Sequence, residues 1–400
     1  MSYVLIRNLR RAAILSHQIR YETTVTNVTQ DDFLFRPSFT QWTKVIREAE
    51  KIVGYPTSFM NLRWLLSDEF ANMAMHLRKV VGSNHPIIHT AKTVIYNEQS
   101  NLQPWGLVIL LLSKALKTSF SPLQMATVIQ NQRILAELTE MIRTGHYIHR
   151  GLLNIPYEDR NPSKDTALFA NKIAILIGDY LLITANGMLA RLRNQDLSYL
   201  ISTALRDLSE GEFFGDRDDQ NMPLPGRPLT INIDDYNITS DTLPLEIIDG
   251  LGTPVREWTL RTMFNGGSLF GRGCQGTVVL SGGDLERQDN AFMFGCHLCL
   301  AWQAASELQK FLQNKEPFSL VSAPVLFALS ENNLLYDLIE GRQNVSDIDL
   351  DLVRNEVAKT EAIEKTRLLY ETNALKAQLY IEMFGDCKSI DAIKSLIRTL

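Results

Sequence analysis

Two cysteines and a histidine in the carboxyl-terminal half have the residue types and the spacing that zinc sites use. Cys296, His297 and Cys299 form the pattern C-H-x-C, and residues three apart on a helix can share a metal ion. The sequence holds four cysteines in all, and the other two, Cys274 and Cys387, form no second closely spaced pair. We therefore predict small residues of a buried core, because free cysteine packs as a small hydrophobe. So few cysteines exclude a disulfide framework and indicate a reducing compartment.

Aspartates and histidines offer two further candidate metal sites. Asp216, Asp218 and Asp219 lie in an acidic, proline-rich stretch without a rigid element to hold a metal, so we predict a solvated loop. His146 and His149 lie three residues apart and share one face of a predicted helix. They could form a weak metal site or a proton relay. No further ligand lies near them in the sequence, and a helix face that lines a cavity explains them without chemistry.

Helices must position these residues, because apolar side chains recur mainly at helical spacing and no sustained period-two alternation marks strands. An all-α fold is therefore predicted.

The longest apolar run, residues 107–112, is too short to cross a bilayer, so we predict a buried core helix and no transmembrane segment. The chain is 45% hydrophobic with a net charge of −5, which fits a packed protein and leaves no basic field for nucleic acid.

Helix boundaries and inward faces can also be predicted. Pro122 and Pro324 stand where each would begin a helix, since proline is tolerated in the first turn. The stretch 345–400 is charged and periodic, which predicts long helices that close a bundle. Its expected inward positions are Leu350, Leu352, Val353, Val357, Ile363, Leu368, Leu369 and Leu375.

Composition divides the chain into regions. Residues 1–21 hold four arginines and no acid among apolar residues, so residues 1–40 are predicted to be a mitochondrial transit segment and a flexible amino terminus. We therefore expect the protein in the mitochondrial matrix. Residues 41–400 are predicted to form one helical domain. Within it, residues 210–257 hold eleven acids, three arginines and five prolines, which predicts a long acidic surface insertion.

Four passages resemble the trans-prenyl diphosphate synthases. Leu135–Asn154 is similar to the family's helix that leads to H-D-D-x-x-D. Asn171–Leu182, NKIAILIGDYLL, is similar to N-K-x-A-x-L-x-G-D-Y-L, and Phe294–Phe311 stands in the place of G-x-x-L-G-x-A-F-Q-I-x-D-D-x-L-D. Glu48–Pro86 resembles the opening of the second subunits of heteromeric decaprenyl and solanesyl (polyprenyl) diphosphate synthases. The resemblance implies an all-α isoprenoid synthase bundle around a central cavity.

In this family, two facing helices each carry aspartates at i, i+1 and i+4, and these hold the Mg²⁺ ions that stabilise the departing diphosphate. The matching positions here are Arg150, Gly151 and Asn154 for the first motif, directly after His149, and Ser306, Glu307 and Lys310 for the second. Glu307 is the one carboxylate left among them. Arg150 and Lys310 would repel Mg²⁺, so we assign this chain no catalytic residue and no metal or cofactor of its own.

Two other substrate contacts of the family are altered as well. Its basic loop G-K-x-x-R-P is matched by Gly82–Pro86, which is one residue shorter, lacks the lysine and has His85 in place of the arginine. Asn265 and Gly266 replace a later lysine–threonine pair. The diphosphate contacts that the family makes are therefore expected to be missing here.

Lys172 and Asp179, in the second passage, do match the family pattern. They could be remnants of the catalytic machinery. The interpretation that we favour is structural: Lys172 caps or pairs locally and Asp179 ties two helices together, because buried charges usually require partners.

The resemblance and the altered motifs together imply a role within an enzyme complex. We expect a non-catalytic, regulatory or structural subunit of a mitochondrial trans-polyprenyl diphosphate synthase, which condenses farnesyl with isopentenyl diphosphate to make the ubiquinone side chain. The expected partner is catalytic subunit 1, in a heterodimer or heterotetramer, and this partner would hold the Mg²⁺. Helices near the cavity would then pack across the subunit interface. The alternative is an independent isoprenoid-lipid-binding or assembly protein without a synthase partner. An autonomous prenyltransferase conflicts with the missing carboxylates.

Overall fold

The computed structural model describes residues 39–54, 103–116, 121–155, 162–229, 250–313, 318–340 and 344–399. Within these ranges the chain is helical, and its only β feature is an isolated bridge between Arg217 and Pro223. The prediction of an all-α fold is confirmed. The predicted transit segment up to residue 38, the loop Gly82–Pro86 and residues 230–249 of the predicted insertion lie outside the described residues.

The described helices follow one another along the chain. They are α2 (Phe39–Val53), α6 (Trp105–Ala115), α7 (Pro122–Arg150), α8 (Pro162–Arg191), α9 (Gln195–Glu210), α10 (Pro254–Thr262), α11 (Ser268–Leu280), α12 (Leu285–Leu312), α13 (Ala323–Glu331), α14 (Asn333–Ile339), α15 (Leu350–Val357), α16 (Ala362–Glu382) and α17 (Lys388–Arg398). Short turns are η3 (Gly211–Phe213), the π-helical η5 (Met263–Gly267) and η6 (Val345–Asp347).

Local sequence accounts for several of these boundaries. Pro122 begins α7 as predicted, and Ser121 before it caps the helix: its hydroxyl accepts from the Gln124 amide at 3.5 Å, and the Gln124 side chain accepts from the Ser121 amide at 3.1 Å. Pro324 stands in the first turn of α13, also as predicted. The apolar run 107–112 is buried within α6, which confirms the predicted core helix.

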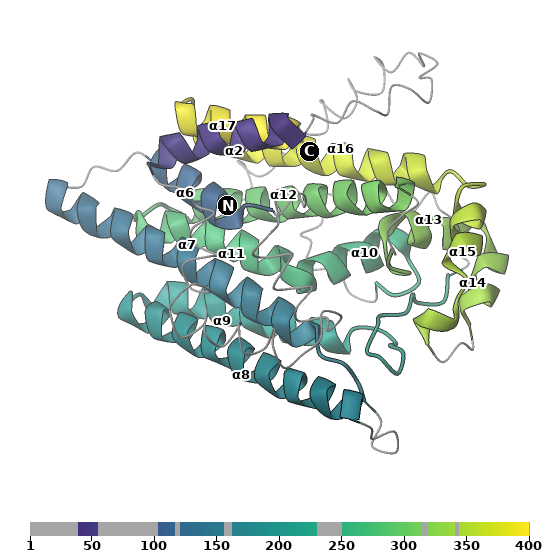
Figure 1. Ribbon diagram of the computed structural model, residues 1–400. Coiled ribbons are helices and arrows are strands. Elements are labelled where there is room, and N and C mark those ends of the chain that lie inside the picture. Colours follow the sequence, from purple (N-terminus) through teal and green to yellow (C-terminus); the bar gives the residue numbers. More distant parts are fainter. Residues whose placement is uncertain are drawn as a thin grey trace, which may run out of the picture.

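Two apolar cores meet at α12, which runs through the middle of the molecule (Figure 1). Phe294, Leu298 and Trp302 of α12 belong to the core shared with α6, α7, α8, α9, α11 and α17. Cys296 and Leu300 belong to the core shared with α10 and α13 to α16. Positions two apart on a helix point in nearly opposite directions, so α12 joins the two halves of the fold. Its second half and the end of α7 face the same space.

Two glycines allow α7 and α8 to cross closely. A Cβ atom at Gly145 would lie 3.2 Å from the backbone oxygen of Gly178, and one at Gly178 would overlap the imidazole ring of His149. His149 Nε2 lies 3.4 Å from Asp179 Oδ1 and 3.3 Å from the Ile175 carbonyl oxygen. The histidine before the first motif is therefore held against α8.

Replacing Gly178 by alanine is expected to lower the free energy of unfolding by about 2 kcal/mol, because the new methyl group must displace His149 or part the two helices. Gly187→Ala is a matched control in the same helix, since a Cβ atom there meets no atom within 4 Å. This control is expected to raise stability by about 0.5–1 kcal/mol through helix propensity. Urea denaturation followed by circular dichroism measures both. Equal effects of the two substitutions would contradict the close-crossing argument.

The structure corrects the predicted surface insertion at both of its ends. The Glu257 side chain is completely buried and accepts hydrogen bonds from the amides of Gly226, at 3.0 Å, and Gly252, at 2.8 Å. Asp218, predicted to lie in a solvated loop, accepts from the amides of Met222 at 2.7 Å and Val345 at 2.8 Å. Acidic side chains here bind backbone amides, so the acidic composition did not mark a purely exposed loop.

Part of α8, residues Ala167–Arg191, is long and apolar enough to cross a membrane by length and composition alone. A third of its most apolar stretch is buried inside the protein, where the helix packs along α7. A core helix of a globular protein meets the same criteria.

Candidate functional site

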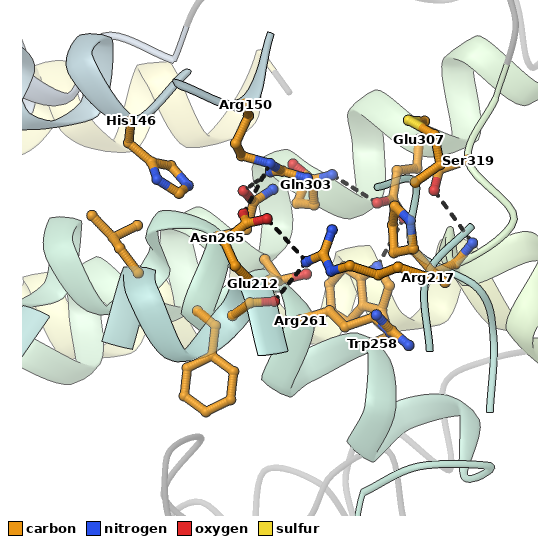
Figure 2. Close-up of a pocket in the computed structure, with 17 residues that line it drawn as sticks. His146, Arg150, Glu212, Arg217, Trp258, Arg261, Asn265, Gln303, Glu307 and Ser319 are labelled. Carbon is orange, nitrogen blue, oxygen red and sulfur yellow. Dashed lines mark hydrogen bonds and ion pairs between the residues drawn. The ribbon is translucent and has the colours of Figure 1, made fainter. Parts of the chain in front are cut away.

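A cavity of about 230 Å³ lies between the end of α7 and the second half of α12. Figure 2 shows Arg150 reaching into it from α7, Gln303 and Glu307 from α12, and Glu212 and Arg217 from the segment that follows α9. The structure thus brings together one position from each altered aspartate motif. Of the remaining four motif positions, none lines the cavity; these are Gly151, Asn154, Ser306 and Lys310.

Asn154 and Gly151 have structural contacts of their own. The side-chain amide of Asn154 donates to the backbone carbonyl oxygen of Asp219 at 2.6 Å. The backbone carbonyl oxygen of Asn154 accepts from the side-chain amide of Gln220 at 3.1 Å. Gly151 is the carboxyl-terminal cap of α7. These contacts tie the end of α7 to the segment that follows α9.

Glu212 pairs with two guanidinium groups at this end of the cavity. Its carboxylate lies 3.4 Å from Arg150 Nε and 3.3 Å from Arg217 Nη2. Arg150 also donates to the side-chain oxygen of Asn265, which was matched to the family's lysine–threonine pair. Arg217 further donates to the carbonyl oxygens of Gly211, at 2.8 Å, and Asn221, at 2.9 Å. The guanidinium group at the first-motif position is therefore bound within the chain, although the single carboxylate of Glu212 offsets only one of the two positive charges.

Arg261, the third arginine that lines the cavity, also has several hydrogen-bond partners within the chain. Its side chain donates to Glu257 at 2.9 Å and to the carbonyl oxygens of Leu224 and Phe214 at 2.8 and 3.2 Å. This ion pair is shielded, because the Glu257 side chain is 0% exposed and that of Arg261 is 10% exposed. Arg261 therefore anchors the segment 214–224 to α10.

Glu307 is the one acid left in the two motifs, and its carboxylate accepts hydrogen bonds from three donors. Its Oε2 accepts from the Trp258 indole at 2.8 Å and from the Ala323 amide at 2.9 Å, while its Oε1 accepts from Gln303 at 2.7 Å. Ser322 gives α13 no side-chain cap, so Glu307 satisfies an amino-terminal amide of that helix instead. Burial raises the pKa of Glu307, although these hydrogen bonds and Lys310 act in the opposite direction.

The side chains that line the cavity do not form a binding site for Mg²⁺. The ion needs near-octahedral oxygen ligands, supplied in such sites by carboxylates together with substrate phosphates. Among the described residues that line the cavity, the carboxylates are Glu212, bound to two arginines, and Glu307, bound to three donors. Three guanidinium groups also face the space, namely those of Arg150, Arg217 and Arg261. A divalent cation would have to displace these ion pairs.

The two histidines of α7 separate in the structure. His146 lines the cavity, and burial together with the charge of Arg150 lowers its pKa to about 4. His149 points to Gly178 and Asp179 on α8 instead, so the prediction that both line one cavity is wrong for His149. The glycine pair at the α7–α8 crossing turns one histidine away from the cavity.

The C-H-x-C residues lie in the core. Cys296 and Cys299 are buried, and burial raises the pKa of Cys299 to about 12. His297 Nδ1 donates to the side-chain oxygen of Asn373 at 2.9 Å, and its ring stacks on that of Tyr380 at 5.7 Å between centroids. The prediction of small, buried core residues agrees with these contacts.

The structural interpretation of the two retained charges holds for Asp179 but not for Lys172. Asp179 joins α8 to α7 through His149, which matches the structural interpretation. Lys172 is exposed on α8 and makes no ion pair with any described residue, so no local pairing explains it. Sequence reasoning missed Glu212, Arg217 and Gln303, because they lie in a presumed surface loop or one turn before the motif, where nothing in the pattern marks them.

Comparisons with known proteins place the fold and the family. The chain is 34% identical over 372 residues, 89% of its length and 86% of the relative, to the all trans-polyprenyl-diphosphate synthase PDSS2 of Homo sapiens. It is 26% identical over 389 residues, 84% of its length and 80% of the relative, to the probable mitochondrial hexaprenyl pyrophosphate synthase of Neurospora crassa. No protein-family model matches the sequence.

Solved structures show the same architecture. A polyprenyl synthase from Caulobacter crescentus superposes with a TM-score of 0.55 at 15% identity, over 86% of this chain and 96% of that one. A decaprenyl diphosphate synthase from Rhodobacter capsulatus superposes with a TM-score of 0.53 at 15% identity, over 86% and 97%. The predicted isoprenoid synthase fold is confirmed. From the fold and the human relative together, it follows that the chain belongs to the all-trans-polyprenyl-diphosphate synthase family, in the group that contains PDSS2.

Proposed function

We propose that this chain is the non-catalytic subunit of a mitochondrial trans-polyprenyl diphosphate synthase, which makes the side chain of ubiquinone from farnesyl and isopentenyl diphosphates. The observation that carries the proposal is the state of Glu307. The one acid left in the two motifs already accepts three hydrogen bonds, and the opposite wall of the cavity presents Arg150. Ionisation of an allylic diphosphate needs Mg²⁺ held between facing carboxylates, so those carboxylates must come from a partner subunit.

Three relatives support the cellular setting. The human relative is a polyprenyl-diphosphate synthase, and the Neurospora crassa and Saccharomyces cerevisiae relatives are hexaprenyl pyrophosphate synthases whose names place them in mitochondria. The arginine-rich, acid-free residues 1–21 agree with import into that organelle. We infer a matrix protein that pairs with catalytic subunit 1 as a heterodimer or heterotetramer, in which Mg²⁺ is bound by the partner.

Purified chain without a partner is expected to form no product from farnesyl diphosphate and labelled isopentenyl diphosphate in Mg²⁺. The same chain coexpressed with the catalytic subunit of its organism should yield a stoichiometric complex that makes polyprenyl diphosphate. The matched control replaces the first aspartate motif of the catalytic subunit by alanines, which should abolish product without disrupting the complex.

Two results would contradict this function. The first is synthesis by the purified chain alone that Glu307→Gln abolishes, because Glu307 would then act on a metal. The second is isolation of the chain without any synthase subunit and with bound isoprenoid lipid, which would identify an independent lipid-binding protein.

A further inference from the structure

The cavity between α7 and α12 carries an excess positive charge beside Arg150. Arg150 and Arg217 both lie against the carboxylate of Glu212, at 3.4 and 3.3 Å, and one carboxylate offsets only one of the two charges. A third guanidinium group, that of Arg261, lines the same space but is paired with the buried carboxylate of Glu257 at 2.8 Å. One positive charge is therefore left without a paired carboxylate among the described residues.

The guanidinium groups of the cavity also repel one another. Burial lowers the pKa of Arg217, and although Glu212 acts in the opposite direction, the charges of Arg150 and Arg261 lower this pKa further. Arg150 uses its Nε and Nη1 groups for Glu212 and Asn265, which leaves its Nη2 group without a described acceptor. An anion in the cavity beside Arg150 would reduce this repulsion and accept hydrogen bonds from the guanidinium group.

The other titratable groups that line the cavity do not cancel this charge. The carboxylate of Glu307 accepts hydrogen bonds from three donors, one of them an amide at the amino terminus of α13, and burial raises its pKa. These contacts weaken its repulsion of an anion. His146 is uncharged at neutral pH, because burial and the charge of Arg150 lower its pKa to about 4. The excess beside Arg150 is therefore a single positive charge.

Apolar side chains complete the wall of the cavity. They include Leu208, Met222, Trp258 and Phe264. The cavity has a volume of about 230 Å³. An apolar protein cavity of about 150 Å³ accepts benzene, so this space has room for a ring together with a carboxylate. A small inorganic anion would leave most of the apolar wall without contacts.

We propose that this cavity binds a monocarboxylic acid with a compact apolar body, whose carboxylate pairs with Arg150 beside Arg217 and whose body packs against the apolar wall. The single negative charge of such a ligand matches the single excess positive charge. A diphosphate group carries several negative charges, and Glu212 and Glu307 would oppose the additional ones. The inference concerns this chain alone and does not depend on the function proposed above.

The ligand class is tested by isothermal titration calorimetry on the purified full-length chain with benzoate, benzamide and acetate at constant ionic strength. One benzoate should bind per chain with a dissociation constant below about 1 mM. Benzamide has the same shape without the charge, and acetate has the charge without the ring, so both should bind at least about tenfold more weakly. Absence of benzoate binding, or equal binding of benzamide or acetate, would overturn the proposal.

Two variants locate the carboxylate. Arg150→Gln should weaken benzoate binding about tenfold or more, because the ligand loses its charged partner. Arg287→Gln is the matched control, since Arg287 is exposed on α12 and lies outside the cavity. Its affinity should equal that of the unmodified chain, and unchanged affinity in Arg150→Gln would overturn the placement. Circular dichroism of each variant checks folding.

Glu212→Gln is expected to strengthen benzoate binding about fivefold or more, because two guanidinium groups then lack a carboxylate and repulsion of the ligand falls. This arm keeps the test decisive even where Arg150→Gln unfolds the chain, since loss of structure cannot increase affinity. Unchanged or weaker benzoate binding by folded Glu212→Gln would contradict an anion beside the two arginines.

Titration with inorganic diphosphate in the absence of Mg²⁺ separates a carboxylate site from a phosphate site. Diphosphate should bind more weakly than benzoate. Tighter binding of diphosphate that Arg150→Gln abolishes would overturn the carboxylate assignment. Failure of this inference leaves the proposed function intact, because that function is measured separately as product formation by the coexpressed subunits.

Discussion

Glu307→Ala is expected to lower the free energy of unfolding by about 4 kcal/mol, because it leaves the Trp258 indole and the Ala323 amide as buried donors without an acceptor. Glu307→Gln should cost only about 1 kcal/mol. The glutamine oxygen can accept from both of those donors, and its amide can donate to Gln303 once the Gln303 side-chain amide is rotated. Urea denaturation, followed by tryptophan fluorescence, gives both values.

Glu286→Ala serves as the control for this pair, since Glu286 is exposed in the first turn of the same helix. This substitution should lower the free energy of unfolding by less than about 1 kcal/mol, which is the size of an exposed charge–dipole interaction. Equal costs at Glu286 and Glu307 would show that the hydrogen bonds of Glu307 contribute little. The alanine variant should be the least stable, because it alone leaves buried donors without an acceptor.

The same variants distinguish a structural acid from a metal ligand. In the coexpressed synthase, Glu307→Gln should keep kcat within about twofold of the unmodified complex, since the proposed function assigns this side chain no contact with substrate or metal. Millimolar MgCl₂ should leave the melting temperature of the isolated chain unchanged, with or without Glu307→Gln. Stabilisation by Mg²⁺ that the glutamine variant loses would identify Glu307 as a ligand.

Acidification is expected to destabilise the protein through His297. Burial, followed by the charge of Lys376, lowers the pKa of His297 from 6.5 to about 3, while its hydrogen bond to Asn373 acts the other way. Below pH 6.5 the unfolded chain binds a proton that the folded chain does not, so stability falls as the pH falls toward 3. At 1.36 kcal/mol per pH unit, the loss reaches about 4 kcal/mol.

The contribution of His297 can be isolated by His297→Gln, whose amide can still donate to Asn373 Oδ1. Denaturant midpoints are measured at intervals from pH 7 to pH 4. The difference in unfolding free energy between the unmodified chain and the variant should shift in favour of the variant as the pH falls. His146 is present in both chains, so it should lower the stability of each at acid pH to a smaller extent, because its pKa is lowered to about 4, and should cancel in the difference. A pH-independent difference would mean that His297 titrates normally in the fold.

Periodicity predicted elements better than it predicted which residues are buried. Val353, Val357 and Leu369 are buried as predicted, whereas Leu352, Leu368 and Leu375 are 41%, 50% and 49% exposed. Leucine is favourable on any helix face, so a run of leucines leaves the inward direction of the helix undetermined. That direction depends on the neighbours of α16, chiefly α12 and α13, which the pattern of α16 alone does not contain.

The amino-acid sequence by itself determined the helical class, the family and the loss of the motif carboxylates, because residue types at fixed spacings can be recognised without coordinates. Only the tertiary structure decided what replaced those carboxylates. Arg150 meets Asn265, 115 positions away, and Glu307 meets Trp258, 49 positions away. It also turned His149 toward α8 and left several apolar side chains of α8 exposed. Contacts between residues so distant in the chain depend on how the helices cross, and the packing of whole helices, not local periodicity, sets those crossings.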